Sequence, residues 1–524
     1  MTNESEPRQS SPTSGEEIRR AIQALEQLAA DRGLLSDLSK DERRRLLDAA
    51  ERVAFPDRAA RKRLIRSFKR KQKEKVEQQK ARDEQLLART GMRTQPGVRQ
   101  LKRPHPPEPF EPEPPPKSDQ PDDHFVERLQ VPRSCYICKR DYDRVHFHYD
   151  SLCEDCAELN WTRRRQTFDL SGRFSLVTGG RVKIGYQAAL KLLRAGSHVI
   201  VTTRFPRDAA DRFTREGDSA NWMDRLLIHG IDLRHTPSVE ALADHLTATL
   251  PRLDFILNNA CQTVRRPPGF YAHLMEGERK LAEALPETAQ QLLRSYEELR
   301  RSDATPAAPT SALPAQVEGS LAGIRKAAEL SQIPLAPGDH DGGTEIFPEG
   351  QLDDDLQQVD LRAVNSWRLR LSEVPTVELL EVHLVNAVAP FILNARLKPL
   401  MLQVPTRDKH IVNVSAMEGV FYRAYKTDKH PHTNMAKAAL NMMTRTSARA
   451  YARDGIHMNS VDTGWITDED PADIARQKRE ELGFHPPLDQ VDAAARICDP
   501  IFQGFLSGEH LWGNFLKDYQ IANW

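Results

Sequence analysis

The sequence predicts an α/β protein built on a doubly wound parallel sheet, together with a small zinc-binding module and a helical N-terminal region. Three observations predict this architecture. Between residues 169 and 260, short runs of Val, Ile and Leu alternate with helical segments, which is typical of parallel strands buried on both faces. Two CxxC pairs precede that region, between residues 135 and 156. Nearer the N-terminus, apolar residues recur at helical spacing.

Length and composition limit the classes of function. The 524 residues favour two or three domains. A mean hydropathy of −0.61 and 35 prolines indicate linkers or tails beside the folded parts. Lys+Arg and Asp+Glu balance at 75 each, so no net charge favours a nucleic acid or a membrane surface. The chain has no run of about eighteen apolar residues and no apolar signal core at its start. We therefore expect a cytoplasmic protein without a membrane partner.

The N-terminal quarter of the chain is expected to hold three segments. They are a polar, disordered leader at 1–15, a helical, basic region at 16–93 and a Pro-rich, extended linker at 94–125. Ser39 and Glu42 match a capping box at a predicted helix start. The helix predicted over residues 58–89 begins with many Lys and Arg. It could bind the phosphates of a nucleic acid or dock on a protein partner, or it could be a solvated helix.

The next segment, residues 126–167, is predicted to be a zinc module. Its candidate ligands are Cys135, Cys138, Cys153 and Cys156. Each CxxC pair can place two thiolates on one cation, and two pairs complete the tetrahedral shell that suits zinc. His146 and His148 lie between the pairs and could either replace a cysteine or lie beside the site. Four thiolates leave no open position, so zinc here would hold the module together rather than catalyse. A peptide- or nucleic-acid-binding role of the module stays open.

A phosphate-binding turn is predicted at "FSLVTGGRVKIGYQ", which follows a strand and opens a helix. In this context backbone N–H groups at the helix N-terminus face a pyrophosphate, and glycines allow its close approach. Residues 262–375 interrupt the alternation of strands and helices, and we interpret them as an insertion. The insertion leaves the carboxyl end of a strand, on the side where doubly wound sheets bind ligands. It could be a lid, a docking element or a surface excursion.

Several ordered segments of residues 168–524, the insertion excluded, resemble the short-chain dehydrogenase/reductase superfamily. They are "LSGRFSLVTGG", "IDLR", "NNA", "VNAVAPF", "IVNVSAMEG", "AKAALNMMTRTSA" and "GIHMNSVDTGW". The resemblance implies a Rossmann-type fold and hydride transfer between a nicotinamide dinucleotide and a small-molecule carbonyl or alcohol substrate. It also implies a homodimer face on two long helices, near 377–403 and 433–454.

The resemblance assigns the cofactor to the glycine turn and to later strand ends. The residues implied are Gly179, Gly180, Arg181, Lys183, Ile184, Gly185, Arg204, Asp232, Asn258, Lys437 and Gly464. Lys183 replaces the middle glycine of the family's turn, where its side chain would either crowd the pyrophosphate or add a phosphate contact. Arg204 stands where a basic residue meets a ribose 2′-phosphate, which favours NADP(H), with NAD(H) as the alternative. Otherwise Arg204 is a solvent-exposed loop residue.

The resemblance also implies catalytic residues: Asn386, Ser415 and Lys437. Thr433 takes the place of the family's catalytic tyrosine. A threonine hydroxyl is too weak an acid to replace a phenol near neutral pH. The loop between Ser415 and Thr433 is longer than the family's and offers Tyr425 as a relocated acid, with Tyr422 and His432 as further candidates.

Two functions follow from these residues. The first is an NADP(H)-dependent oxidoreductase, favoured because Asn386, Ser415 and Lys437 are all retained. The second is a non-catalytic protein that senses a dinucleotide or acts as a scaffold, with the zinc module and the basic helix as interaction arms. Thr433 and Lys183 motivate this alternative. A nucleic-acid-binding arm is a third, weaker interpretation, tested by the salt dependence of binding.

Overall fold

The protein is described by a computed structural model that covers residues 15–94, 124–280, 282–301, 320–336, 338–340, 343–353, 355–423, 426–467, 469–482 and 485–524. It divides into two compact units, Met1–Arg82 and Asp83–Trp524. The leader predicted at 1–15 and the linker predicted at 94–125 lie almost wholly outside the described residues.

The first unit is helical. It contains α1 (Gly15–Ala30), a 3-10 turn (Arg32–Asp37), α2 (Lys40–Ala54) and most of α3 (Arg58–Leu87). The capping box predicted at the start of α2 is confirmed: Glu42 N donates to Ser39 Oγ at 3.3 Å, and Ser39 N donates to Glu42 Oε2 at 3.0 Å. Neither α1 nor α2 buries a residue, so their apolar side chains lie at the surface of this unit.

The second unit begins with the cysteine module. Its elements are α4 (Gly91–Thr94), β1 (Phe125–Ser134), β2 (Asp141–His146) and α5 (Glu154–Arg165). β1 and β2 form an antiparallel hairpin that pairs Ser134 with Asp141. Tyr142, Tyr149 and Trp161 pack in the module's core. The cysteine module therefore has an apolar core of its own.

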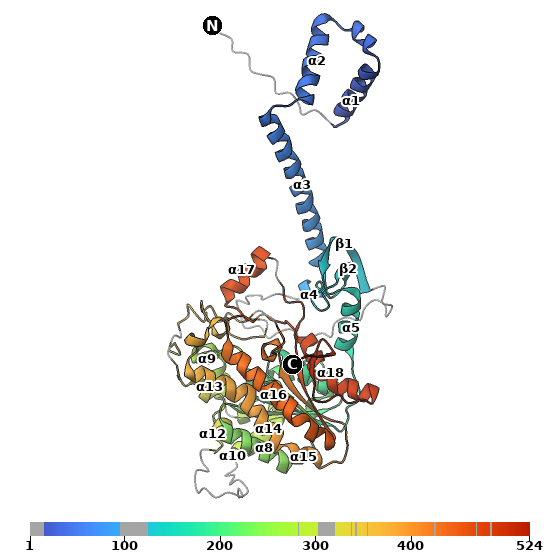
Figure 1. Ribbon diagram of the computed structural model, residues 1–524. Coiled ribbons are helices and arrows are strands. Elements are labelled where there is room, and N and C mark those ends of the chain that lie inside the picture. Colours follow the sequence, from blue (N-terminus) through green and yellow to red (C-terminus); the bar gives the residue numbers. More distant parts are fainter. Residues whose placement is uncertain are drawn as a thin grey trace. The chain divides into compact units, whose positions relative to one another are not determined.

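An eight-stranded sheet organises the rest of this unit (Figure 1). Its strands are β3 (Phe174–Thr178), β4 (His198–Thr203), β5 (Leu226–Gly230), β6 (Phe255–Asn258), β7 (Lys409–Ser415), β8 (Ile456–Asp462), β9 (Phe515–Lys517) and β10 (Gln520–Ala522). The spatial order is β10-β9-β8-β7-β6-β3-β4-β5, and every pair is parallel except β9 with β10. This order confirms the predicted doubly wound, Rossmann-type α/β fold, with its topological switch between β3 and β6.

Helices cover both faces of the sheet. They are α6 (Lys183–Arg194), α7 (Pro206–Thr214), α8 (Thr236–Thr249), α13 (Thr376–His383), α14 (Ala389–Arg396), α15 (Lys398–Leu402), α16 (Pro431–Arg453) and α18 (Gln490–Ser507). A further helix, α17 (Ala472–Leu482), projects from these layers and buries none of its residues 472–481 (Figure 1). α6 packs with α18 on one face, and α8, α14 and α16 lie on the other. Val, Ile and Leu of the strands are buried between these layers.

One stretch of helix among the described residues, Thr376–Arg396, is long and apolar enough by composition to cross a membrane, and 39% of its most apolar window is buried inside the protein. It consists of α13, a π-helical turn at Leu384–Val388, and α14. Val382 and Leu393 of this stretch are fully buried in the domain. Core helices of soluble proteins pass the same test of length and composition.

The insertion packs against the sheet. Its described elements are α9 (Pro268–Glu278), α10 (Glu287–Arg301), α12 (Ala322–Arg325) and 3-10 turns at Ala282–Ala284, Glu329–Gln332, Ser366–Arg368 and Leu371–Glu373. Leu292 and Leu293 of α10 are fully buried in the main core, next to the edge strand β5. Tyr271 of α9 packs on Phe205 at the start of α7. These parts of the insertion are therefore structural, rather than a surface excursion.

Candidate active site and metal centre

The predicted phosphate-binding turn joins β3 to α6. Gly179 has φ +69°, and a Cβ there would lie 2.9 Å from the Cα of Ala260. A Cβ on Gly185 would lie 2.3 Å from the Gly179 carbonyl oxygen. Asn259, which the sequence did not single out, fixes the turn because its Nδ2 donates to the carbonyls of Thr178 at 3.0 Å and Gly179 at 3.2 Å. Both glycines are thus required by close backbone approach.

Lys183 opens α6 with φ +56°, a left-handed conformation that explains why the family has glycine there. Burial lowers the pKa of its ammonium, but the carboxylates of Glu469, Asp355 and Asp353 outweigh burial, and the net pKa is raised. Asp353 and Asp355 belong to the insertion, and Glu469 follows β8. The positive charge of Lys183 is therefore balanced within the chain, and its contact with a cofactor phosphate stays a prediction.

Two arginines predicted to meet the cofactor already have protein partners. Arg181 donates from Nη1 to Asp208 at 2.6 Å. Arg204, at the end of β4, donates from Nη2 to Tyr271 Oη at 2.6 Å, and its guanidinium lies 4.6 Å from the centre of that ring. Arg204 is half-buried, so it is not the solvent-exposed loop residue of the alternative interpretation. Its contact with a 2′-phosphate stays a prediction.

Asp232 and Asn258 lie where the sequence puts them, but their side chains are engaged. Burial raises the pKa of Asp232, but hydrogen bonds from Arg234 (Nη2–Oδ2 2.6 Å) outweigh this and the pKa is lowered. Asn258 donates from Nδ2 to Asn394 Oδ1 at 2.9 Å and to Asn413 Oδ1 at 2.8 Å, inside the sheet core. The amide of Asn258 joins β6, β7 and α14, and its contact with a cofactor stays a prediction.

The predicted serine and lysine both lie at the carboxyl end of β7. Ser415 is the last residue of that strand, and Lys437 of α16 donates from Nζ to the Val414 carbonyl at 2.7 Å. Thr433 lies one turn before Lys437 on the same helix face. Ser415 Oγ and Thr433 Oγ1 are both buried, and within the described part of the chain neither has a hydrogen-bond partner. Such buried hydroxyls are uncommon except at sites that bind a ligand or water.

Unlike Ser415 and Thr433, Asn386 has hydrogen-bond partners for its side chain. It lies in the π-helical turn Leu384–Val388, a distortion frequent at functional sites. Its Oδ1 accepts from Gln262 N at 2.7 Å, and its Nδ2 donates to Gln262 O at 3.2 Å. Asn386 therefore ties the start of the insertion to the helix beside the candidate site.

The candidate acids differ in surroundings. Tyr425 lies outside the described residues. Tyr422 is half-exposed, and its nearest polar contact is Met417 Sδ at 3.8 Å. His432 is buried, with Nε2 3.2 Å from Oε1 of Glu378 and with no partner for Nδ1 among the described residues. Burial raises the pKa of Glu378, but hydrogen bonds with His432 and Ser366, together with nearby positive charges, outweigh it and the pKa is lowered. The sequence analysis missed Glu378, whose signal was an acidic residue on a mostly apolar helix.

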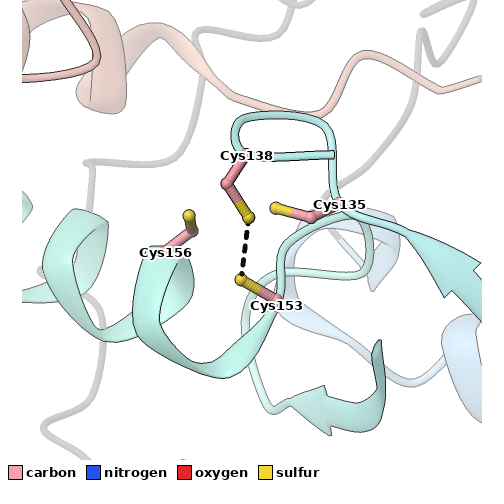
Figure 2. Close-up of side chains that lie close together, drawn as sticks. All are labelled: Cys135, Cys138, Cys153 and Cys156. Atoms are coloured by element: carbon pink, nitrogen blue, oxygen red, sulfur yellow. Dashed lines mark hydrogen bonds between the residues drawn. The ribbon is translucent and has the colours of Figure 1, made fainter. Parts of the chain in front are cut away.

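The four predicted zinc ligands converge (Figure 2). Their Sγ atoms all lie within 4.8 Å of one another, and Cys138 Sγ is 3.5 Å from Cys153 Sγ. One pair follows β1 and the other begins α5. Burial raises the pKa of the Cys138 thiol, but hydrogen bonds with Arg140, Cys153 and Cys135 together outweigh it and lower the pKa to about 6, whereas burial raises the pKa of Cys153 to about 11 and also that of Cys156. The donor set fits zinc because four sulfurs converge at tetrahedral spacing.

A second group of possible ligands, His124, His146 and Glu158, does not fit a metal. His146 Nδ1 accepts from the backbone N–H groups of His148 at 3.1 Å and Tyr149 at 3.3 Å. A neutral imidazole then carries its proton on Nε2, which faces Glu158 Oε1 at 3.7 Å. Nε2 therefore has no lone pair for a metal. His146 and His148 lie in the aromatic core beside Trp161, outside the sulfur cluster.

Two family models match the chain on either side of the insertion. The model described as short chain dehydrogenase matches residues 173–275, and the model described as enoyl-(acyl carrier protein) reductase matches residues 363–495. The chain belongs to the short-chain dehydrogenase/reductase superfamily. The matched ranges contain the phosphate-binding turn, Ser415 and Lys437, as the resemblance implied.

Relatives of this superfamily member differ in how much they share with it. An uncharacterized protein, R665, of Acanthamoeba polyphaga mimivirus is 29% identical over 386 residues, which is 71% of each chain. The (+)-neomenthol dehydrogenase of Capsicum annuum is 31% identical over 17% of this chain and 29% of its own. The rhamnolipids biosynthesis 3-oxoacyl-[acyl-carrier-protein] reductase of Pseudomonas aeruginosa is 38% identical over 18% of this chain and 35% of its own. The chain thus spans about a third of these reductases.

Solved structures of the superfamily also align with the chain. A Pseudomonas aeruginosa RhlG/NADP active-site complex aligns with a TM-score of 0.39 and 18% identity, over 67% of this chain and 96% of the other. A dehydrogenase/reductase from Sinorhizobium meliloti aligns with a TM-score of 0.40 and 17% identity, over 68% and 96%.

Proposed function

We propose that this superfamily member is an oxidoreductase that transfers hydride between NADP(H) and a small carbonyl or alcohol substrate. The observation that carries the proposal is the arrangement of Ser415 and Lys437. Lys437 is buried and donates to the Val414 carbonyl, and the next residue in the chain, Ser415, has a buried hydroxyl without a hydrogen-bond partner within the described chain. A buried ammonium beside a buried hydroxyl is costly for stability, and a reacting carbonyl with a ribose would use both groups.

The chain's own residues have separate roles in this proposal. Gly179 and Gly185 let a pyrophosphate approach the N-terminus of α6, where backbone N–H groups bind anions. Arg204 would bind the 2′-phosphate, and Lys437 the ribose hydroxyls. Ser415 would donate a hydrogen bond to the carbonyl oxygen. When bound, the nicotinamide supplies or accepts the hydride.

The proton needs a donor, because Thr433 cannot supply it near neutral pH. Tyr425 remains the acid predicted from sequence. The structure favours His432 as a second candidate, because its buried Nε2 pairs with Glu378 and its Nδ1 is unpartnered within the described residues. A carboxylate that orients an imidazole and stabilises its charged form is a recurring arrangement in proton transfer. Histidine also titrates nearest to neutral pH.

We further propose that the four cysteines bind one structural zinc ion. Four sulfurs close a tetrahedral shell without an open position, so the metal would stabilise the hairpin and α5.

The proposed homodimer rests on the family and on apolar side chains exposed at the surface. A homodimer would form through α13, α14 and α16, where Leu380, Phe391, Met435 and Met442 are exposed. A cytoplasmic location is part of the same proposal.

One observation favours the non-catalytic alternative. Arg181, which should face the cofactor phosphates, donates instead to Asp208, and the charges of Glu469, Asp355 and Asp353 raise the pKa of Lys183. A protein that senses a dinucleotide without converting it would show binding that depends on displacing those carboxylates. It would show no turnover with any carbonyl.

The first experiment is a fluorescence titration of the protein with NADPH and NADH, together with Lys183→Gly. Tight NADPH binding and weaker NADH binding would support the oxidoreductase, and turnover that Lys437→Ala abolishes would complete the case. Binding without turnover across a panel of aldehydes and ketones would favour the sensor. Absence of binding by the wild type, restored by Lys183→Gly, would mean that the Lys183 side chain closes the site.

A further inference from the structure

The cysteine module touches the candidate active site through one tyrosine. Tyr136 lies inside the first CxxC pair, between Cys135 and Cys138. Its Oη accepts a hydrogen bond at 3.0 Å from the backbone N of Trp465, a residue 329 positions later in the chain.

The segment that Tyr136 holds lies beside the reactive serine. In the parallel pair β7–β8, Ser415 is opposite Asp462, the last residue of β8. Gly464 and Trp465 follow two and three residues later, at the carboxyl end of the sheet where ligands bind in this fold. A change in the backbone of Gly464–Trp465 would therefore move a wall of the candidate site.

A second contact from the module's core restricts the same segment. Gly464 has φ +80°, and a Cβ there would lie 2.5 Å from Cδ1 of Leu488. Leu488 is fully buried in the apolar cluster of the cysteine module. The segment is thus packed against Leu488 on one side and hydrogen-bonded to Tyr136 on the other.

The module is itself fixed to the sheet domain. Arg164 of α5 donates to both carboxylate oxygens of Asp489, the N-cap of α18, at 2.6 and 2.9 Å. Tyr149 Oη donates to Asp492 Oδ1 at 2.5 Å. These bonds are largely buried, where charge-assisted hydrogen bonds are strong. Tyr136 therefore belongs to a module that is held firmly against the sheet domain.

We propose that Tyr136 is a positioning residue of the cofactor site, which holds the Gly464–Trp465 backbone where the nicotinamide end of the dinucleotide binds. This rests on the proposed NADP(H) binding. The four thiolates fix the loop that carries Tyr136, so the module serves the active site as well as its own stability. Binding or loss of the metal at the four cysteines would therefore affect cofactor binding.

The test compares Tyr136→Phe with Tyr142→Phe. Tyr142 belongs to the same module, but its Oη donates to the Asp150 carbonyl within the module at 2.6 Å. Hydrogen exchange is measured at the Trp465 amide, the donor of the bond. Affinity is measured for NADPH and for 2′,5′-ADP, which lacks the nicotinamide. Zinc content is checked in both variants.

Tyr136→Phe should speed exchange of the Trp465 amide and weaken NADPH binding by about threefold to tenfold, the range for one lost hydrogen bond. It should leave 2′,5′-ADP binding and zinc content unchanged, and Tyr142→Phe should change neither exchange nor affinity. Unchanged exchange, or equal weakening of both ligands, would overturn the proposal. If the wild type binds 2′,5′-ADP but not NADPH, or binds neither, the proposed function fails, and the positioning role fails with it. Faster exchange would then show only a structural link between Tyr136 and this segment.

Discussion

The imidazole Nε2 of His432 lies 3.2 Å from Oε1 of Glu378, and both side chains are buried between α16 and α13. The pair adjoins Thr433, the residue at the family's tyrosine position. His432 was among the candidates from sequence, and its partner Glu378 is what the structure adds to it.

The first prediction concerns this acid. His432→Asn should lower kcat by about 10²-fold to 10⁴-fold, the usual contribution of a general acid, and leave the Kd for NADPH unchanged. Glu378→Gln should lower kcat less and shift the pH–rate profile, because it changes the proton affinity of His432. Tyr425→Phe is the matched comparison. Loss of turnover in Tyr425→Phe with normal turnover in His432→Asn would assign the acid to Tyr425 instead.

A second prediction separates binding from chemistry at the serine and lysine. Ser415→Ala should lower kcat by at least about 10²-fold without changing NADPH affinity, because a hydrogen bond to the carbonyl oxygen strengthens in the transition state. Lys437→Ala should lower both kcat and NADPH affinity, because Lys437 would contact the ribose as well. Stopped-flow turnover and fluorescence titration measure the two quantities. Normal turnover in Ser415→Ala would exclude the proposed chemistry.

The third prediction concerns the metal. Cys138→Ser should remove bound zinc and lower the thermal midpoint of unfolding, because metal affinity contributes directly to folding stability. Cys261→Ser is the control, since Cys261 is exposed and lies outside the sulfur cluster. Metal analysis and thermal unfolding in matched buffers provide the measurements. Equal zinc content in both variants would mean that the four cysteines do not bind the ion.

A fourth prediction follows from Glu278, a buried carboxyl at the end of α9. Burial raises its pKa to about 7, although its oxygens accept hydrogen bonds from the backbone N–H groups of Asp208 (2.9 Å) and Arg207 (3.3 Å). A carboxyl with a raised folded-state pKa binds more protons folded than unfolded, so stability falls as pH rises from about 4.5 to about 7. Glu278→Gln should remove this part of the pH dependence. The neighbouring, exposed Glu276 gives the control Glu276→Gln, and equal slopes of thermal midpoint against pH for both variants would contradict the prediction.

Much of the fold could be predicted from local sequence. Strands β3 to β8 coincide with runs of Val, Ile and Leu, because strands buried on both faces need apolar residues at nearly every position. The phosphate turn was predicted because its glycines follow a strand and open a helix, and the structure shows that Gly179 and Gly185 meet backbone atoms too close for any Cβ. The cysteine cluster was predicted because two CxxC pairs suffice to surround one cation.

Other features escaped sequence analysis because they depend on which segments pack together. The hydrogen bonds from Asn258 to Asn394 and Asn413 could not be predicted, because they depend on the register of β6 with β7 and on the position of α14. Glu378 could be assigned a partner only once α13 and α16 were side by side. Likewise, only the structure showed that the insertion packs beside β5, where Leu292 and Leu293 are buried.

By itself, the sequence determined the superfamily, the alternation of strands and helices and the residue types available for chemistry. Local geometry and apolar patterning depend on neighbours a few positions away, so they can be read along the chain. The tertiary structure alone decided that the charges of Asp353, Asp355 and Glu469 act on Lys183, and that Tyr136 holds Trp465. Those interactions join residues far apart in sequence. They become strong only when folding brings the charged groups and the hydrogen-bonding groups together in a low-dielectric interior.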